Sequence, residues 1–143
     1  MKPFVFLGGT VGESSWRQSV TLLLIQAGVP AERIFDPVVS EWTDQSQALE
    51  DEAKRQADYL LFYLCDVSGY SLVEATMGLY DRMVSTVVVF DLAGLEGHAL
   101  KSLVKCEHDL RARFPTGLIF STAGEAVAAI AGVRVKTSTG GLS

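Results

Sequence analysis

Short uncharged runs alternate along the chain with longer segments whose apolar residues recur at intervals of three and four. Runs of three to seven residues that are rich in aromatic or β-branched side chains indicate strands, and where such a run carries no charge, as at 59–65 and 85–90, it is typical of a strand buried on both faces. Apolar residues at helical spacing predict amphipathic helices between these runs. We therefore expect five strands, at 4–7, 33–36, 59–65, 85–90 and 118–120, and five helices, at about 16–27, 45–57, 72–80, 98–113 and 122–132.

This alternation predicts an α/β fold, because a strand followed by a helix returns as a parallel strand through a right-handed crossover. Five such units favour a single doubly wound, flavodoxin- or Rossmann-like domain over residues 1–135, with a parallel sheet in the order 2-1-3-4-5 and a polar tail at 136–143. In that order the topological switch point, where successive connections change their direction across the sheet, lies between the first and third strands. The loops at 8–12 and 66–70 should then face one crevice.

Composition narrows the range of partners. The net charge is −5, and the basic residues form no stripe, which argues against a nucleic-acid polymer or an anionic membrane as partner. The apolar runs are too short to span a bilayer, and the N-terminus has no signal-peptide pattern. Two cysteines, Cys65 and Cys106, are interpreted as reduced, buried core residues, so a cytoplasmic setting is expected. Neither histidine has metal-ligand spacing to a cysteine, and we expect no metal and no cofactor.

The first crevice loop is small and polar. A strand, a glycine loop and a helix N-terminus together expose backbone N–H groups that can hold an anion or a hydroxyl. The alternative is a tight turn without a binding role. If the loop does bind a ligand, the candidate residues are Gly8, Gly9 and Thr10, an N-cap at Ser14 or Ser15, and Arg17 as an added charge in the first helical turn.

Carboxylates and one tryptophan complete the candidates. Glu74 is expected in the first turn of the third helix, after a turn in which Gly69 permits a positive φ. A carboxylate there lies where open α/β sheets bind ligands, although acidic residues also oppose the helix dipole at that position. Glu50 belongs to an acidic row that is otherwise typical of a solvated helix face. Trp42, in the loop after the second strand, packs on its own domain or stacks on a ligand.

These residues resemble the nucleoside 2-deoxyribosyltransferase-like superfamily, including its hydrolase branch, the deoxynucleoside 5′-monophosphate N-glycosidases. The resemblance covers roughly residues 4–80. It rests on the order and spacing of four segments. The first two are the strand and glycine loop at 6–10 with Trp16, and the loop from 36–37 to Trp42 after the second strand. The other two are the helix that carries Glu50, ahead of the pair at 57–58, and the segment 70–74 followed by Gly78.

The resemblance implies cleavage of the N-glycosidic bond of a nucleoside or nucleoside 5′-monophosphate, by hydrolysis or base transfer. It assigns Glu74 as the nucleophile, and Glu50 as the group that holds a sugar hydroxyl or protonates the leaving base. The residues expected to bind substrate are Gly8, Gly9, Thr10, Trp16, Arg17, Trp42, Ser68 and Tyr70.

Two departures from the family pattern refine this expectation. Ser68 falls where the transferases usually have an aspartate and the phosphate-accepting hydrolases a serine, which favours a nucleotide. Phe6 and Thr10 stand around a position where many members place a tyrosine, which weighs against ordinary transferase activity.

Related proteins complete their sites with a neighbouring subunit, so a homodimer or larger assembly is expected. The alternatives are a nucleotide sensor without catalysis and a TIR-like NAD-cleaving enzyme.

Overall fold

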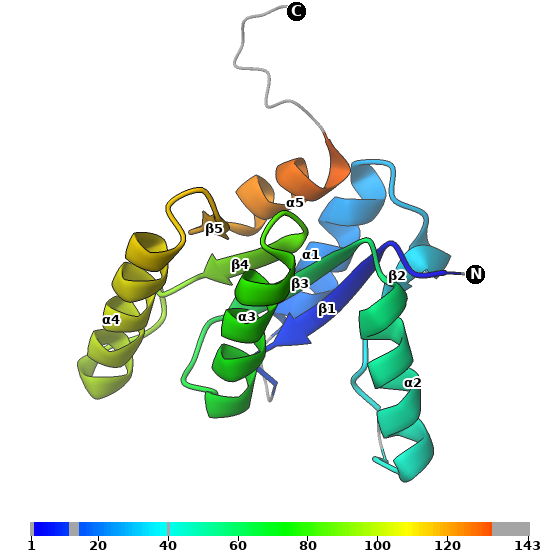
Figure 1. The fold of residues 1–143 in the computed structure, drawn as a ribbon, viewed down its shortest axis with the longest axis horizontal. Coiled ribbons are helices and arrows are strands. Elements are labelled where there is room, and N and C mark those ends of the chain that lie inside the picture. Colours follow the sequence, from blue (N-terminus) through cyan, green and yellow to red (C-terminus); the bar gives the residue numbers. More distant parts are fainter. Residues whose placement is uncertain (1, 12–14, 40, 133–143) are drawn as a thin grey trace, which may run out of the picture.

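A computed structural model describes residues 2–11, 15–39 and 41–132 of the chain. Its centre is a sheet of five parallel strands in the order β2-β1-β3-β4-β5, as predicted (Figure 1). The strands are β1 (Val5–Gly9), β2 (Ile34–Phe35), β3 (Tyr59–Leu64), β4 (Thr86–Phe90) and β5 (Leu118–Phe120). The helices are α1 (Trp16–Gln26), α2 (Asp44–Gln56), α3 (Gly69–Arg82), α4 (Gly97–Arg113) and α5 (Ala123–Ala131), with a 3-10 turn at Ala31–Arg33.

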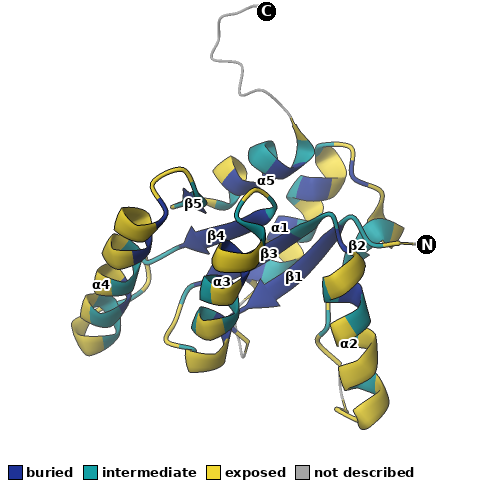
Figure 2. Ribbon diagram, viewed as in Figure 1, coloured by how far each residue is buried: buried dark blue, intermediate teal, exposed yellow. Residues whose placement is uncertain are grey.

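Helices cover both faces of the sheet, which explains why the central strands carry no charge. Alternate strand residues point to opposite faces. Phe6, Phe62 and Phe90 pack in one core with side chains of α2, α3 and α4, whereas Leu7 and Leu61 pack in a second core with α1 and α5. Figure 2 shows the resulting pattern, with buried central strands and helices whose outer sides are exposed. This arrangement confirms the predicted doubly wound α/β fold.

The N-terminal boundary of α3 was predicted wrongly. The helix begins at Gly69, with Ser68 as N-cap, so Glu74 lies in its second turn. Gly69 is a helical residue and is not among the glycines with positive φ. Glu74 is therefore farther from the helix N-terminus than expected, and opposition to the helix dipole, which acts within the first turn, explains it poorly.

The buried face of α3 also differs from its most apolar positions. The residues that pack inward are small or slender: Ser71, Ala75, Gly78 and Leu79. A Cβ atom at Gly78 would lie 2.9 Å from the side chain of Thr86, so the glycine lets α3 approach β4 closely. Val73, Met77 and Tyr80 are exposed instead.

Several smaller predictions can be compared with the structure. Thr122 and Glu125 form the predicted capping box at the start of α5. Cys65 and Cys106 are half-buried at the margins of the two cores, whereas full burial was predicted. Ser15 is the N-cap residue of α1 but makes no side-chain capping hydrogen bond. The alternative N-cap Ser14, residue 12 of the glycine loop and the tail at 136–143 lie outside the described residues. Across the described ranges, no helix is both long and apolar enough to cross a membrane.

Candidate active site

A pocket of about 610 Å³ opens at the carboxyl ends of β1 and β3, between the loops that follow these strands. Most of the predicted site residues line it: Gly8, Gly9, Arg17, Trp42, Glu50, Ser68, Tyr70 and Glu74. Sequence reasoning did not single out the remaining lining residues, which are Val11, Pro37, Val38, Val39, Gln47 and Ser71. The pocket lies at the switch point of the sheet, where open α/β folds bind ligands.

Backbone forms the floor of this pocket. Gly9 has a φ of 129°, and a Cβ atom there would lie 2.2 Å from the carbonyl oxygen of Tyr63. A Cβ atom at Gly8 would lie 2.7 Å from the ring of Phe62. Position 9 therefore requires glycine, because its positive φ would direct a side chain into the backbone of β3. At Gly8 the ring of Phe62 occupies the space that a side chain would need.

Thr10 and Trp16 lie behind the pocket and do not line it. The Thr10 hydroxyl accepts a hydrogen bond from the backbone N–H of Cys65 at 3.1 Å, which ties the end of β1 to the end of β3. Trp16 is buried, stacks on Tyr63 with ring centroids 4.8 Å apart, and donates through Nε1 to the carbonyl of Thr10 at 2.7 Å. These two residues support the loop from below.

Arg17 reaches the pocket, but both terminal nitrogens of its guanidinium are already engaged, while its buried Nε has no hydrogen-bond partner among the described residues. It donates to the carbonyl oxygens of Leu7 at 2.9 Å and Gly9 at 3.4 Å, and it forms an ion pair with Asp36 at 3.0 Å. Burial lowers the pKa of Arg17, an effect that the charge of Asp36 opposes. Arg17 therefore fixes the wall formed by β1 and β2, and it has less capacity for a substrate anion than we expected.

Two carboxylates in the pocket share one cation. Glu50 and Lys54 lie one turn apart on α2, and Glu74 faces them from α3. The Nζ atom of Lys54 lies 2.6 Å from Oε2 of Glu74 and 3.8 Å from Oε2 of Glu50. Each carboxylate side chain is only 14% exposed. The ammonium also lies 5.8 Å from the ring centroid of Phe6, which forms an apolar side of the cluster.

Lys54 is the main residue that sequence reasoning missed. Its spacing of four residues from Glu50 was a usable signal, because such residues lie on one face of a helix. Its contact with Glu74 could not be predicted from sequence spacing, because Glu74 lies on another helix.

The cluster shifts the protonation of its members. Burial raises the pKa of Glu50, and the charges of Glu74 and Asp51 add to this effect, while Lys54 opposes it. Burial alone lowers the pKa of Lys54, but its hydrogen bond to Glu74 and the charges of Glu74 and Glu50 outweigh this and raise it. The site thus combines a carboxyl group that holds its proton more readily than usual with a firmly charged ammonium.

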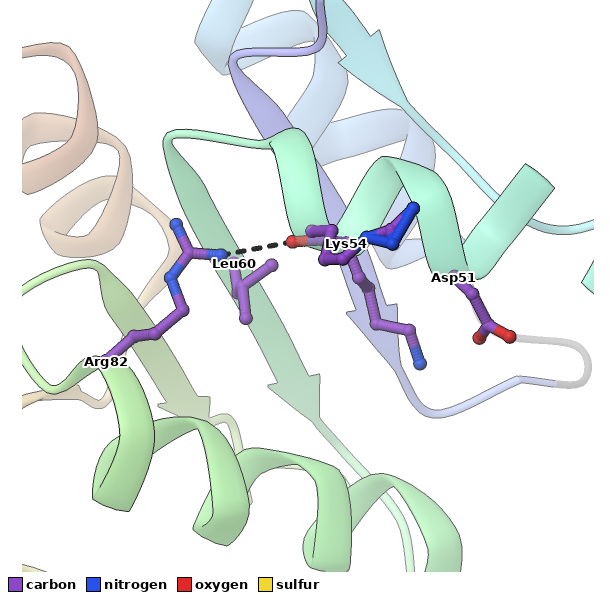
Figure 3. A pocket seen from close by; sticks show the side chains of 5 residues that line it. Asp51, Lys54, Leu60 and Arg82 are labelled. Carbon is purple, nitrogen blue, oxygen red and sulfur yellow. Dashed lines mark hydrogen bonds between the residues drawn. The ribbon is translucent and has the colours of Figure 1, made fainter. Parts of the chain in front are cut away.

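Arg82 fixes the backbone of α2 beside this cluster. Its guanidinium donates to the carbonyl oxygens of Lys54 at 3.0 Å, Ala57 at 2.6 Å and Asp58 at 3.4 Å. Figure 3 shows Arg82 reaching from α3 to the carbonyl of Lys54, at a hollow of about 300 Å³ that Asp51 and Leu60 also line. The last carbonyls of a helix lack intrahelical partners, so Arg82 both satisfies them and joins α2 to α3.

The described ranges contain no group of three or more His, Cys, Asp or Glu side chains that could hold a metal ion. The polar groups that line the pocket include the carboxylates of Glu50 and Glu74 and the hydroxyl groups of Ser68, Tyr70 and Ser71.

Comparison with known proteins bears on the first two thirds of the chain. No curated protein and no solved structure matches the chain. A family model described as nucleoside 2-deoxyribosyltransferase like matches residues 2–92, a range that includes every residue lining the pocket. The match covers more than half of the chain and confirms the resemblance seen in the sequence. The chain therefore belongs to the nucleoside 2-deoxyribosyltransferase-like family.

Proposed function

We propose that this protein cleaves the N-glycosidic bond of a nucleoside or nucleoside 5′-monophosphate, with Glu74 as the nucleophile. Membership of the family supports nucleoside-related glycosyl transfer or cleavage in general. The observation that carries the specific proposal is the position of Glu74, whose carboxylate lines the switch-point pocket and is held by Lys54 at 2.6 Å. A fixed carboxylate next to a bound sugar is the arrangement that covalent glycosyl transfer requires.

The reaction proceeds in two steps. A carboxylate oxygen of Glu74 attacks the anomeric carbon as the bond from that carbon to the base breaks, which leaves the sugar attached to Glu74 as an ester. Water or a second base then attacks the same carbon and releases Glu74 as a carboxylate. Both steps pass through an oxocarbenium-like transition state, whose positive charge the carboxylates of the pocket stabilise.

Glu50 is proposed to protonate the leaving base. Burial raises the pKa of Glu50, which suits a proton donor. Because one Nζ atom lies within 3.8 Å of both Oε2 atoms, these oxygens are closer together than the roughly 6.5–9.5 Å between carboxyl groups that is typical of inverting glycosidases. This short separation favours the covalent route, in which the second carboxyl group acts as acid and then as base.

The walls of the pocket suit the two ends of a nucleoside. Trp42 and the apolar segment 37–39 lie on one side, where a flat base can pack. Ser68 and Ser71 lie at the start of α3, where hydroxyl groups can face the sugar and its 5′ end. The volume of about 610 Å³ falls within the range of roughly 300–1,000 Å³ usual for small-molecule sites.

Replacing the nucleophile tests this proposal. The protein would be incubated with separate pools of nucleosides, deoxynucleoside 5′-monophosphates and NAD, and the released base would be measured by chromatography. We expect base release from one of the first two pools. Glu74→Gln should lower this rate by about 10³-fold or more, because the amide oxygen is a poor nucleophile. Glu52→Gln, on α2 at a position that does not line the pocket and whose side chain is 47% exposed, is the matched control and should keep wild-type activity.

Each alternative gives a different result in the same experiment. A TIR-like enzyme would release nicotinamide from NAD alone, and a nucleotide sensor would bind a ligand without releasing base from any pool. A Glu74→Gln variant that kept more than a few per cent of wild-type turnover would show that Glu74 is not the nucleophile.

A further inference from the structure

We propose that Lys54 is a positioning residue that changes carboxylate partner during the reaction, holding Glu74 in the unmodified enzyme and Glu50 once Glu74 has become an ester. This inference rests on the proposed function, because it requires Glu74 to lose its charge in the first step. It adds to that function a residue outside the pocket lining and a reason for the close spacing of three charged groups.

The geometry makes the exchange short. The Nζ atom of Lys54 is 2.6 Å from Glu74 and 3.8 Å from Glu50, so it is within ion-pair distance of both carboxylates at once. The backbone of Lys54 is fixed, because Arg82 donates to its carbonyl oxygen at 3.0 Å (Figure 3). A small rotation at the end of the lysine side chain is therefore sufficient, and neither helix has to move.

Charge is conserved through the first step. At the start Glu74 is a carboxylate, Lys54 is an ammonium and Glu50 carries a proton. When Glu74 bonds to the anomeric carbon, the base leaves with the electrons of the broken bond and takes the proton of Glu50. Glu74 is then a neutral ester and Glu50 a carboxylate, so the ammonium still faces one negative charge. In the second step Glu50 takes a proton from the attacking water, and Glu74 regains its charge as the ester bond breaks.

This exchange explains how Glu50 can serve as acid and then as base. With Lys54 paired to Glu74, burial raises the pKa of Glu50, and the negative charge of Glu74 adds to this effect, while the ammonium at 3.8 Å offsets only part of it. Once Glu74 is uncharged, the nearest ammonium acts on Glu50 alone and lowers that pKa. The other charged or titratable groups that act on the cluster are Asp51 on α2, Arg17 on α1 and Tyr70 on α3. None of these three changes charge in the scheme.

The test uses a variant as a chemical imitation of the intermediate. Glu74→Gln removes the charge of Glu74 as the ester does. Carboxyl-carbon NMR of protein with labelled glutamate side chains would follow the titration of Glu50, whose signal is assigned by its loss in Glu50→Gln. We expect Glu74→Gln to lower the pKa of Glu50 by at least about one pH unit when Lys54 is present. In a protein that already carries Lys54→Met, Glu74→Gln should lower the pKa of Glu50 by clearly less.

A purely structural role for Lys54 gives a different result. If Lys54 only joined α2 to α3, Glu74→Gln would lower the pKa of Glu50 equally with and without the lysine, and the inference would be overturned. Lys54→Gln repeats the measurement if Lys54→Met does not fold, and thermal unfolding of each variant checks its integrity. Because this titration needs no substrate, its result is independent of whether the proposed function is correct.

Kinetics give a second reading on whichever substrate pool is active. Lys54→Met should lower kcat and move the alkaline limb of kcat/KM to higher pH, because loss of the ammonium raises the pKa of Glu50. Lys54→Arg should restore part of the rate, and Lys105→Met, at an exposed position on α4, should change neither. Loss of activity in Glu74→Gln with an unchanged limb in Lys54→Met would refute this inference and leave the proposed function standing.

Discussion

Ser68 caps the start of α3 without making the side-chain hydrogen bond that a serine in this position often provides. It lines the pocket together with Tyr70 and Ser71 from the first turn of the same helix. The first N–H groups of a helix lack intrahelical partners and favour negative charge. Because Arg17 is already paired with Asp36, this end of the pocket is the better place for a 5′-phosphate.

We therefore expect a nucleoside 5′-monophosphate to bind more tightly than the matching nucleoside. Two charge-assisted hydrogen bonds of roughly 1.5–3 kcal/mol each would give a difference of about two to four powers of ten. Ser68→Asp should remove at least about one power of ten, because a carboxylate repels the phosphate, whereas the uncharged Ser68→Asn should change it less. Calorimetry with both ligands measures the difference, and equal affinities in the wild type would contradict the phosphate interpretation.

The helices α2 and α3 are joined at two places along their length. Lys54 contacts Glu74 through its side chain, and Arg82 contacts the carbonyl oxygens at the end of α2, including that of Lys54. The second contact holds the first in place, because it fixes the backbone from which the lysine side chain extends. The placement of Lys54 beside Glu74 thus depends on a residue that lies two turns beyond Glu74 on α3.

Arg82→Met should weaken this connection. The change leaves three part-buried carbonyl oxygens without their guanidinium partner, so we expect the free energy of unfolding to fall by about 1–3 kcal/mol. Base release should fall as well, since Lys54 would be less well placed. Urea unfolding and the base-release assay measure the two effects. Arg55→Met, at an exposed position on the same helix as Lys54, should alter neither, and unchanged stability in Arg82→Met would show that the contact is dispensable.

The sequence pattern predicted the features of the helices and strands that depend on neighbouring residues in the chain. Short apolar runs predicted the strands, and their alternation with helices predicted a doubly wound sheet and its strand order. The loops after the first and third strands were correctly expected at one crevice. The start of α3 was missed because Gly69 was interpreted as part of a turn, although it is the first residue of the helix. The buried face of α3 was also hidden, because it uses Ala75 and Gly78, whereas the more apolar Val73 and Met77 face outward. The contact of Lys54 with Glu74 and those of Arg82 with α2 join different helices, so no local pattern could show them.

The outward stripe of α3 matters for the whole molecule. Tyr70, Val73, Met77 and Tyr80 recur at helical spacing and are each more than half exposed. An apolar row of this kind on one helix is typical of a surface that meets a partner. Tyr70 also lines the pocket, so a second copy packed on this face would lie against the site. We propose that the protein is a homodimer or larger assembly formed through this face.

Met77→Glu should therefore shift the protein towards monomer. A charge in the centre of an apolar interface loses its water without gaining a partner, so association should weaken by at least about tenfold. Light scattering at micromolar concentration gives the mass of the wild type and the variant. Val104→Glu, at an exposed position on α4, is the control and should leave the mass unchanged. A monomer mass for the wild type would remove the proposal.

The pocket draws its lining from one part of the chain. Its residues fall between Gly8 and Glu74, and no described residue beyond Glu74 lines it, although β4, β5, α4 and α5 come later. Within one chain, substitutions in those later elements act on the pocket indirectly, through the packing of the sheet behind it. Protein engineers could therefore vary substrate range with a library confined to the first half, and draw stabilising changes from the second, with little interference between the two searches.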